Sequence, residues 1–233
     1  EFIYASRLTG ILAQTGGEPV AVQLRAEVTR QAIMEAAVDQ FNGIGYGNTT
    51  LADIISRAGI TKGAFYYHFD TKESVAAAVI EEAEGRKSAA IVEVVSSVSP
   101  AFEKLIRLGF TVADGIRRDK LIRAGHLLRQ SLNQVSQSGP QSYVEQPRML
   151  AALAEVAIAE GDLRSDLDAN DFAQAGFAAI LGSHLLAGAI GDDVCARMAQ
   201  IWRVMMPGIV APEAVGYWRQ FVARLEQRYV QPN

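Results

Sequence analysis

Between residues 61 and 72 the sequence gathers side chains whose hydrogen-bond donors suit contact with DNA. The donors are the ammonium, phenol and imidazole groups of Lys62, Tyr66, Tyr67, His68 and Lys72. Groups of this kind bind phosphate oxygens and the edges of bases in the grooves of the duplex. Gly63 and Ala64 lie among them and are small enough to let a helix backbone approach the floor of a groove. The combination predicts a short helix that lies in the major groove, since packing alone gives a surface helix no reason to be so aromatic.

The neighbouring residues predict the helix-turn-helix that would hold this short helix in place. Gly59 stands where the preceding helix must end, because glycine readily takes the left-handed conformation of a helix C-terminus. Thr49 or Thr50 can cap that helix and Thr61 the next, since a threonine oxygen accepts a hydrogen bond from a free N–H of the first turn. Helical spacing gives both segments an apolar face. The residues of these faces are Leu51, Ile54, Ile55, Ala58, Phe65 and Phe69.

This stretch resembles the DNA-binding signature of the TetR family of bacterial transcriptional regulators. The matching residues are Thr50, Asp53, Ile54, Ala58, Gly59, Ile60, Thr61, Lys62, Gly63, Phe65, Tyr66, His68, Phe69 and Lys72, and before them Arg30, Ile33, Ala36, Ala37, Phe41, Gly45 and Tyr46. The residues that the resemblance places against the major groove are Lys62, Gly63, Ala64 and Tyr66. Those that it implies hold phosphates are Tyr67, His68, Lys72 and either Thr49 or Thr50.

Composition permits a folded protein with a large core and limits how it can bind DNA. The chain has 233 residues, of which 49% are hydrophobic, and a formal net charge of −4. This net charge excludes a protein held to DNA by bulk positive charge, so the donors of residues 62–72 must act through their positions. The single cysteine, Cys195, leaves no partner for an internal disulfide. We expect a cytoplasmic bacterial protein that is nucleoid-associated when bound to DNA.

Two other functional classes are weaker interpretations. An enzyme is disfavoured because three histidines and one cysteine are too scattered to form a metal site, and no nucleophile elbow, phosphate loop or HExxH helix occurs. We therefore expect no catalytic residue, no metal and no cofactor. An interaction module that has lost DNA binding is disfavoured because the donors of residues 62–72 are all present.

The whole sequence predicts an all-α fold of two parts. We expect a flexible N-terminal arm at 1–21, a three-helix head with the helix-turn-helix at 22–75, and a larger helical domain for ligand binding and dimerisation at 76–233. The predicted helices, which show helical periodicity without strand alternation, span 25–42, 71–95, 101–117, 119–137, 147–160, 169–190, 193–206 and 212–229. Pro147 is expected to delay or kink the helix around it.

The segment 172–191 carries no formal charge and is long enough to span a bilayer. Three features favour instead a buried helix and no membrane partner. The segment contains several glycines and the polar residues Gln174, Ser183 and His184, and its flanking residues are acidic, with no basic residue to orient it in a membrane.

A homodimer on a palindromic double-stranded operator is expected, because one recognition helix buries little surface and operator symmetry mirrors protein symmetry. The small residues of 172–191 would let a second helix approach closely. The last helix offers an apolar stripe that could form the interface or the core of a single chain. Its residues are Trp218, Phe221, Val222, Leu225 and Tyr229.

Polar residues on otherwise apolar helices indicate a ligand pocket in the larger domain. A pocket for a small molecule is mostly apolar, with a few well-placed donors and acceptors. The expected ligand-binding residues are Gln130, Tyr143, Gln134, Leu127 and Trp202, and further polar-tipped residues on apolar segments are Thr111, His126 and His184. This set suits a small neutral or weakly acidic molecule.

The larger domain also resembles one branch of the TetR family, the γ-butyrolactone receptors. The segments that carry this resemblance are 123–128, Gln134, Gly139-Pro140 and 206–212, and the loop 160–168 is common in TetR regulators. Where those receptors place a pocket tryptophan, this chain has Tyr143 and Val144. The resemblance implies a repressor of antibiotic or secondary-metabolite genes that a small diffusible inducer, a γ-butyrolactone or furan, releases from DNA. The alternative is a drug-sensing repressor of an efflux pump gene.

Overall fold

The computed structural model describes the backbone of residues 17–132 and 139–230 and the side chains of 23–132 and 144–230. Over these ranges the regular elements are helices, α2 to α11, and strand-like pairing is limited to one isolated β-bridge between Leu163 and Val210. The expected all-α fold is confirmed. The chain divides into two compact units, Glu1–Val79 and Ile80–Asn233, and the division falls within α5 (Lys72–Ser96).

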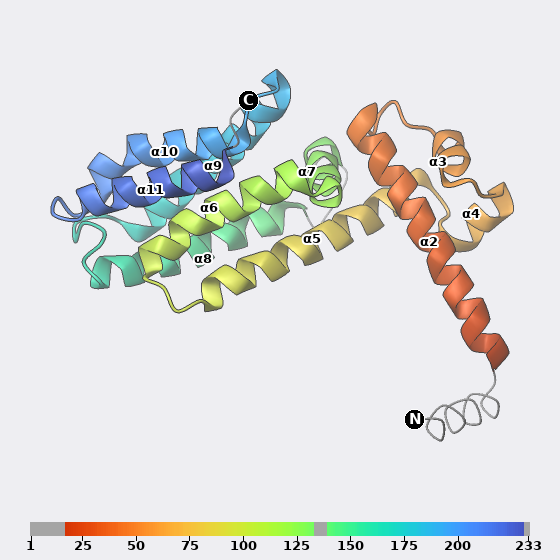
Figure 1. Cartoon of the computed structure of the whole chain (residues 1–233), viewed down its shortest axis with the longest axis horizontal. Coiled ribbons are helices and arrows are strands. Elements are labelled where there is room, and N and C mark those ends of the chain that lie inside the picture. Colours follow the sequence, from red (N-terminus) through yellow and green to blue (C-terminus); the bar gives the residue numbers. More distant parts are fainter. Residues whose placement is uncertain (1–16, 133–138, 231–233) are drawn as a thin grey trace, which may run out of the picture. The chain divides into compact units, whose positions relative to one another are not determined.

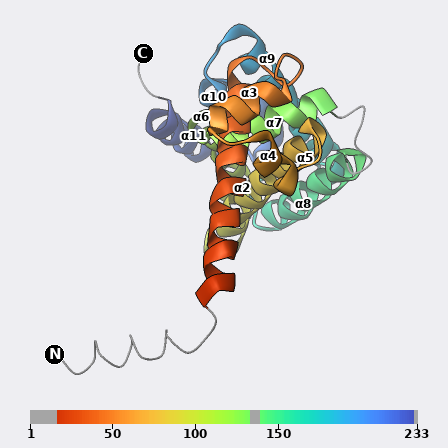
Figure 2. The same ribbon diagram turned by 90° about the vertical axis from the view of Figure 1, so that its right-hand side faces the viewer.

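The first unit is built on α2 (Gly17–Gly43), against which α3 (Leu51–Ala58) and α4 (Lys62–His68) pack. Figure 2 shows the two short helices beside α2. The largest buried side chains of this unit are Ile33, Met34, Phe41, Ile54 and Phe65. Residues 17–21 are helical, which corrects the flexible arm expected at 1–21; Pro19 suits the first turn of a helix, where its missing N–H has no partner to lose. Residues 1–16 lie outside the described range.

The turn between α3 and α4 forms as its sequence predicts. Thr50 caps α3: its Oγ1 accepts from the N–H of Asp53 at 3.2 Å, and the Asp53 carboxylate accepts from the N–H of Thr50 at 2.8 Å. Gly59 ends α3 with a φ of 65°, in the left-handed region. Thr61 caps α4 by accepting from the N–H of Ala64 at 3.1 Å. These local hydrogen bonds fix where α4 begins, and therefore which of its residues face solvent.

The second unit is organised around α6 (Ala101–Arg118), which Figure 1 shows running between α11 and α8. The other helices of the unit are α7 (Lys120–Leu132), α8 (Gly139–Ala159), α9 (Ala169–Ile190), α10 (Val194–Ile209) and α11 (Val215–Tyr229). All except α9 pack against α6, and α9 packs against α8 and α10. The buried residues of α6 are Ala101, Phe102, Leu105, Ile106, Leu108, Gly109, Phe110 and Ala113.

The apolar stripe of α11 belongs mainly to the core of the single chain. Trp218, Val222 and Leu225 are buried, and the Trp218 ring meets Phe102 of α6 edge-on with centroids 4.8 Å apart. The buried part of the stripe therefore belongs to the core of the unit, whereas Phe221 and Tyr229 are only partly buried in the single chain.

The loop after α8 ties three helices together through its carboxylates. Glu160 Oε2 accepts from the N–H of Ala101 at 2.8 Å, which satisfies a free donor at the start of α6. Asp162 Oδ1 accepts from the indole N–H of Trp218 at 3.0 Å, and Gly161 between them has a φ of 83°. The TetR-like loop seen in the sequence thus positions α6 and α11.

Two prolines lie inside helices, which corrects the boundaries expected around them. Pro147 lies within α8, which begins at Gly139 rather than at 147, and Pro207 lies within α10. A proline inside a helix removes one hydrogen bond and costs about 3 kcal/mol. In α8 the buried Ala151 and Ala154 face packed neighbours, and this packing offsets the lost hydrogen bond.

Helix α9 is less buried than the sequence led us to expect. By length and composition it is apolar enough to cross a membrane, yet only 22% of its most apolar stretch of 18 residues is buried within the described chain. Its buried residues include Phe172, Ser183 and His184, whereas Leu185 and Leu186 are more than half exposed. One face of α9 therefore packs inside the unit, and the other leaves apolar surface uncovered.

Candidate DNA-contacting helix and ligand pocket

The exposed face of α4 carries the side chains that the sequence selected for DNA. Tyr66 is 46% exposed and Tyr67 is 75% exposed. Phe65, on the opposite face of α4, is fully buried and anchors the helix to the head. Lys62 is exposed, and its Nζ lies 5.8 Å from the centroid of the Tyr66 ring. The helix therefore presents one ammonium and two phenol groups to solvent.

Three smaller or less exposed residues complete this surface. Gly63 is exposed and Ala64 is half-buried, so the start of α4 stays low between the larger side chains. His68 is half-buried at the end of α4, and its ring meets Tyr67 edge-on with centroids 4.9 Å apart. His68 thus braces Tyr67.

The two threonines before α3 are more occupied than expected. Thr49 is only 1% exposed and donates its hydroxyl to the carbonyl of Gly45 at 2.8 Å, so burial removes it from the DNA-facing surface. Thr50 is exposed, but its hydroxyl is 2.7 Å from the Asp53 carboxylate, to which it can donate. The expected phosphate contact is therefore corrected for Thr49, and at Thr50 it would compete with the helix cap.

Lys72 does not reach outward, which corrects the orientation expected from the sequence. Its Nζ donates to the carbonyls of Tyr46 at 2.9 Å and Thr49 at 2.8 Å, and lies 4.2 Å from the Tyr46 ring centroid. The Tyr46 hydroxyl in turn donates to Glu73 at 2.9 Å. Burial, with the Glu73 carboxylate beside it, raises the pKa of Tyr46 to about 12. Lys72 therefore joins α5 to the loop before α3.

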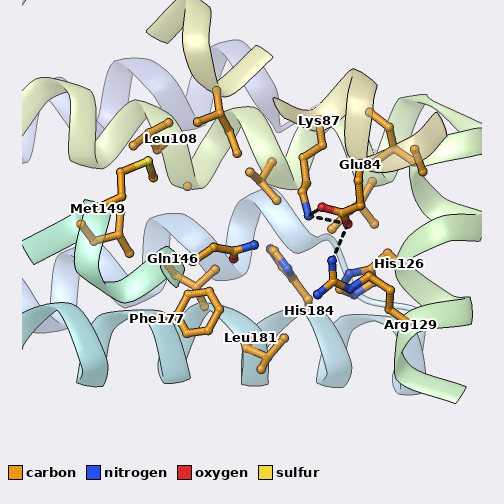
Figure 3. A pocket seen from close by; sticks show the side chains of 18 of the residues that line it. Glu84, Lys87, Leu108, His126, Arg129, Gln146, Met149, Phe177, Leu181 and His184 are labelled. Carbon is orange, nitrogen blue, oxygen red and sulfur yellow. Dashed lines mark hydrogen bonds and ion pairs between the residues drawn. The ribbon is translucent and has the colours of Figure 1, made fainter. Parts of the chain in front are cut away.

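The second unit contains a cavity of about 130 Å³ that is lined by residues of five helices, α5 to α9. A cavity needs only about 10–15 Å³ of such volume to hold one water molecule, so this one can hold a small organic ligand. Most of its wall is apolar, with Phe177, Met149 and Leu108 among the larger side chains. Most of its polar groups come from α5 and α7, and α8 and α9 add Gln146 and His184, which Figure 3 labels.

A charged cluster lies at one end of this cavity. Glu84 pairs with Lys87 on the same helix at 2.7 Å and with Arg129 of α7 at 2.9 Å. Burial raises the pKa of Glu84, but its hydrogen bonds and charge interactions with the two cations outweigh burial and hold that pKa below its ordinary value. Glu84 is therefore ionised at neutral pH.

Two histidines supply uncharged polar groups next to the cluster. His126 Nε2 lies 2.9 Å from the Gln130 side-chain nitrogen, and the His126 and His184 rings meet edge-on with centroids 5.5 Å apart. Burial, followed by the positive charges of Lys87 and Arg129, lowers the pKa of His126 to about 4. Burial, followed by His126 and Lys87, lowers the pKa of His184 to about 4. Both rings are neutral at pH 7.

His184 also carries a buried polar atom without a partner among the residues whose side chains are described. Its side chain is 7% exposed, and its Nε2 makes no hydrogen bond within those residues. A buried polar atom without a partner is unfavourable by about 1–3 kcal/mol, so this nitrogen is suited to bind a ligand. In Figure 3 His184 and Gln146 point toward the same part of the cavity.

The structure sorts the ligand-binding residues expected from the sequence. Gln130 lines the cavity, as expected. Leu127 does not: it is 36% exposed, because Leu128 takes the buried position on α7. Trp202 does not line this cavity either. Its ring lies against Phe102, and it lines a smaller cavity of about 20 Å³. Gln134 and the side chain of Tyr143 lie outside the described residues.

Sequence reasoning missed the charged cluster and Gln146. Glu84, Lys87 and Ile91 recur at helical spacing on one face of α5, which is the signal that could have placed them together. That signal shows a shared face but not what the face meets, so Arg129 had no sequence cue. His126 and His184 were noted as polar-tipped residues, and the structure brings them into contact.

Comparison with known proteins identifies the family of the chain. The family described as bacterial regulatory proteins, tetR family, matches residues 33–79. The solved structure of CprB from Streptomyces coelicolor A3(2), a TetR family protein, is 30% identical; the match covers 87% of this chain and 98% of that one, with a TM-score of 0.74. The chain belongs to the TetR family.

Two further matches extend over most of the chain. The A-factor receptor protein of Streptomyces griseus is 29% identical over 200 residues, which are 85% of this chain and 70% of that protein. A solved γ-butyrolactone receptor, described as ArpA-like, is 28% identical with a TM-score of 0.76, covering 88% of this chain and 99% of that one. CprB has also been solved in complex with its biological operator sequence.

Proposed function

We propose that this TetR-family protein is a repressor that a small γ-butyrolactone-type signal releases from its operator. The observation that carries the proposal is helix α5. Its first turn contributes Lys72 to the DNA-binding head, and the same continuous helix contributes Glu84 and Lys87 to the wall of the cavity. A ligand in the cavity therefore contacts the helix that also fixes part of the head.

Release requires a difference in affinity between two states of the protein. A ligand shifts an equilibrium only if it binds the released state more tightly than the DNA-bound state. In a two-fold dimer the recognition helices must match major-groove sites separated by roughly 34 Å, one turn of B-DNA. A change in α5 on ligand binding would alter that match. We propose that the protein acts in the cytoplasm and lies on the nucleoid while bound.

A second copy of the chain is the proposed cover for the exposed face of α9. Leu185, Leu186 and Ile190 are between 51% and 65% exposed there, on a helix that carries little charge. An exposed apolar surface of this kind marks an interaction site. Homodimerisation suits a DNA-binding protein that reads a palindromic operator.

The similarity of this chain to lactone receptors favours this function over the drug-sensing alternative. The relatives that match most of the chain include a γ-butyrolactone receptor and the A-factor receptor protein. The HTH-type transcriptional regulator TtgR of Pseudomonas putida has a higher identity, 45% over 56 residues, but that match spans only 24% of this chain. The repressor of an efflux pump gene therefore has the weaker support.

The direct test is a gel shift with the promoter region next to the protein's own gene. We expect a specific complex that γ-decalactone, a simple alkyl γ-butyrolactone, dissociates in a concentration-dependent manner. Cyclodecane, which has no ester group, serves as the apolar control and should leave the complex intact. A complex that the lactone does not affect at any soluble concentration would contradict release by a lactone-type signal.

Replacing Lys62 with alanine is expected to weaken operator binding without affecting the fold. Each of the two recognition helices of the dimer loses one positive charge. Loss of both ionic contacts should lower the magnitude of the slope of log Kobs against log salt by about 1.8, measured by fluorescence anisotropy at several salt concentrations. The matched control is Lys120→Ala, which removes the same charge from α7 in the other unit. An unchanged slope for Lys62→Ala would show that Lys62 makes no ionic contact with the DNA.

A further inference from the structure

The cavity wall carries more positive than negative charge. Among the described lining residues the formally charged groups are Lys87, Arg129 and Glu84, because His126 and His184 are neutral at pH 7. The balance is two cations against one carboxylate. Binding a molecule with one negative charge would bring the lining to electrical neutrality.

These charges are sheltered from solvent. The side chains of Lys87 and Arg129 are 19% and 17% exposed, and that of Glu84 is 30% exposed. Charges interact more strongly where apolar walls lower the effective dielectric constant, and charge-assisted hydrogen bonds to a carboxylate are stronger than those between neutral groups. The end of the cavity next to Lys87 and Arg129 is therefore suited to an anion.

The polar and apolar groups of the cavity are separated along its length. Figure 3 shows Leu108, Met149 and Phe177 gathered away from Lys87 and Arg129, with Gln146 and His184 between the two groups. The Nε2 of His184, which has no partner among the described side chains, adds a neutral hydrogen-bonding site in this middle part. A ligand that fills the whole cavity would have a charged head, a polar group next to it and an apolar tail.

We infer that the pocket selects an amphipathic monocarboxylate, whose carboxylate binds Lys87 and Arg129, over the corresponding uncharged lactone. The inference rests on the proposed release by a small lactone-derived signal and assigns the bound form to the ring-opened acid. Hydrolysis of a γ-butyrolactone breaks the ring ester by addition of water and yields a γ-hydroxycarboxylate, which carries both a carboxylate and a hydroxyl group. In this arrangement the hydroxyl lies near His184 and the alkyl chain extends toward Phe177.

The test compares γ-decalactone with 4-hydroxydecanoate, which has the same carbon skeleton and one negative charge at pH 7. Isothermal titration calorimetry gives the Kd of the full-length protein for each, and the gel shift gives operator release. We expect the hydroxycarboxylate to bind about tenfold or more tightly than the lactone, since a charged hydrogen bond replaces a neutral one. Decanoate, which lacks the hydroxyl, should bind with intermediate affinity.

Variants assign the selectivity to the charged cluster. Lys87→Met should weaken binding of 4-hydroxydecanoate by about tenfold and leave the Kd for the lactone within about twofold. Arg86→Met is the matched control, because Arg86 is the neighbouring residue on α5, is about half exposed and does not line the cavity. Glu84→Gln, which leaves two cations without the carboxylate, should tighten binding of the hydroxycarboxylate. Arg129→Met provides a second test if Lys87→Met fails to fold, as judged by circular dichroism.

The outcomes separate this inference from the proposed function. If the lactone binds more tightly than the hydroxycarboxylate and releases the operator, the inference is wrong and the proposed function stands. If the hydroxycarboxylate binds tightly but Lys87→Met and Arg129→Met leave its Kd unchanged, the carboxylate does not bind this cluster and the inference is again wrong. If neither molecule binds or releases the operator, both proposals fail.

Discussion

Replacing Leu186 with glutamate is expected to convert a dimer into a monomer and to lower operator affinity by about 10²–10⁴-fold. Leu186 is 51% exposed in the single chain and lies next to Leu185, which is 56% exposed, on the uncovered face of α9. Burial of an unpaired carboxylate in an apolar interface is strongly unfavourable, so two such charges near a two-fold axis should prevent association. Loss of the second recognition helix then removes half of the operator contacts.

Sedimentation equilibrium measures the mass of the species, and anisotropy titration measures operator binding. The matched control is Val98→Glu, which places the same charge at a fully exposed apolar residue between α5 and α6. This control should remain dimeric and bind the operator normally. If Leu186→Glu also remains dimeric at micromolar concentration, the uncovered face of α9 is not the dimer interface.

The helix-turn-helix could be predicted from sequence because its determinants are local. Gly59 and Thr61 each act on backbone groups within a few residues of themselves, and the structure places both as expected. The same reasoning stopped short at Thr49 and Thr50, because both can cap a helix and only the fold decides which one is buried. Lys72 was misplaced for a related reason: its partners are the carbonyls of Tyr46 and Thr49, more than twenty residues away.

The pocket was harder to predict because its residues come together through tertiary packing. Glu84 and Arg129 lie on different helices, and nothing in the local sequence of either indicates the other. Helical periodicity defines a face only to within one residue, which is why Leu127 was selected although Leu128 is the buried neighbour. Trp202 was correctly recognised as a polar-tipped residue of an apolar helix, yet packing assigns it to another cavity.

The paired histidines of the pocket are expected to make the second unit less stable in mild acid. The pKa of each is lowered to about 4 from an ordinary value of 6.5, with burial as the main cause. Between these values the unfolded chain binds more protons than the folded one, so the free energy of unfolding falls as pH falls through this window. Between pH 7 and pH 5 the loss is about 2 kcal/mol for each histidine, and about 4 kcal/mol for the pair.

Urea unfolding at pH 7 and pH 5, followed by tryptophan fluorescence, measures this loss in the second unit alone. Both tryptophans of the chain, Trp202 and Trp218, lie in that unit. The double variant His126→Gln/His184→Gln should lose most of the pH dependence over this range, whatever its stability at pH 7. His68→Gln removes the third histidine, which lies in the first unit, and should retain the wild-type pH dependence. Equal pH dependence in the wild type and the double variant would mean that neither pocket histidine is neutral because of burial.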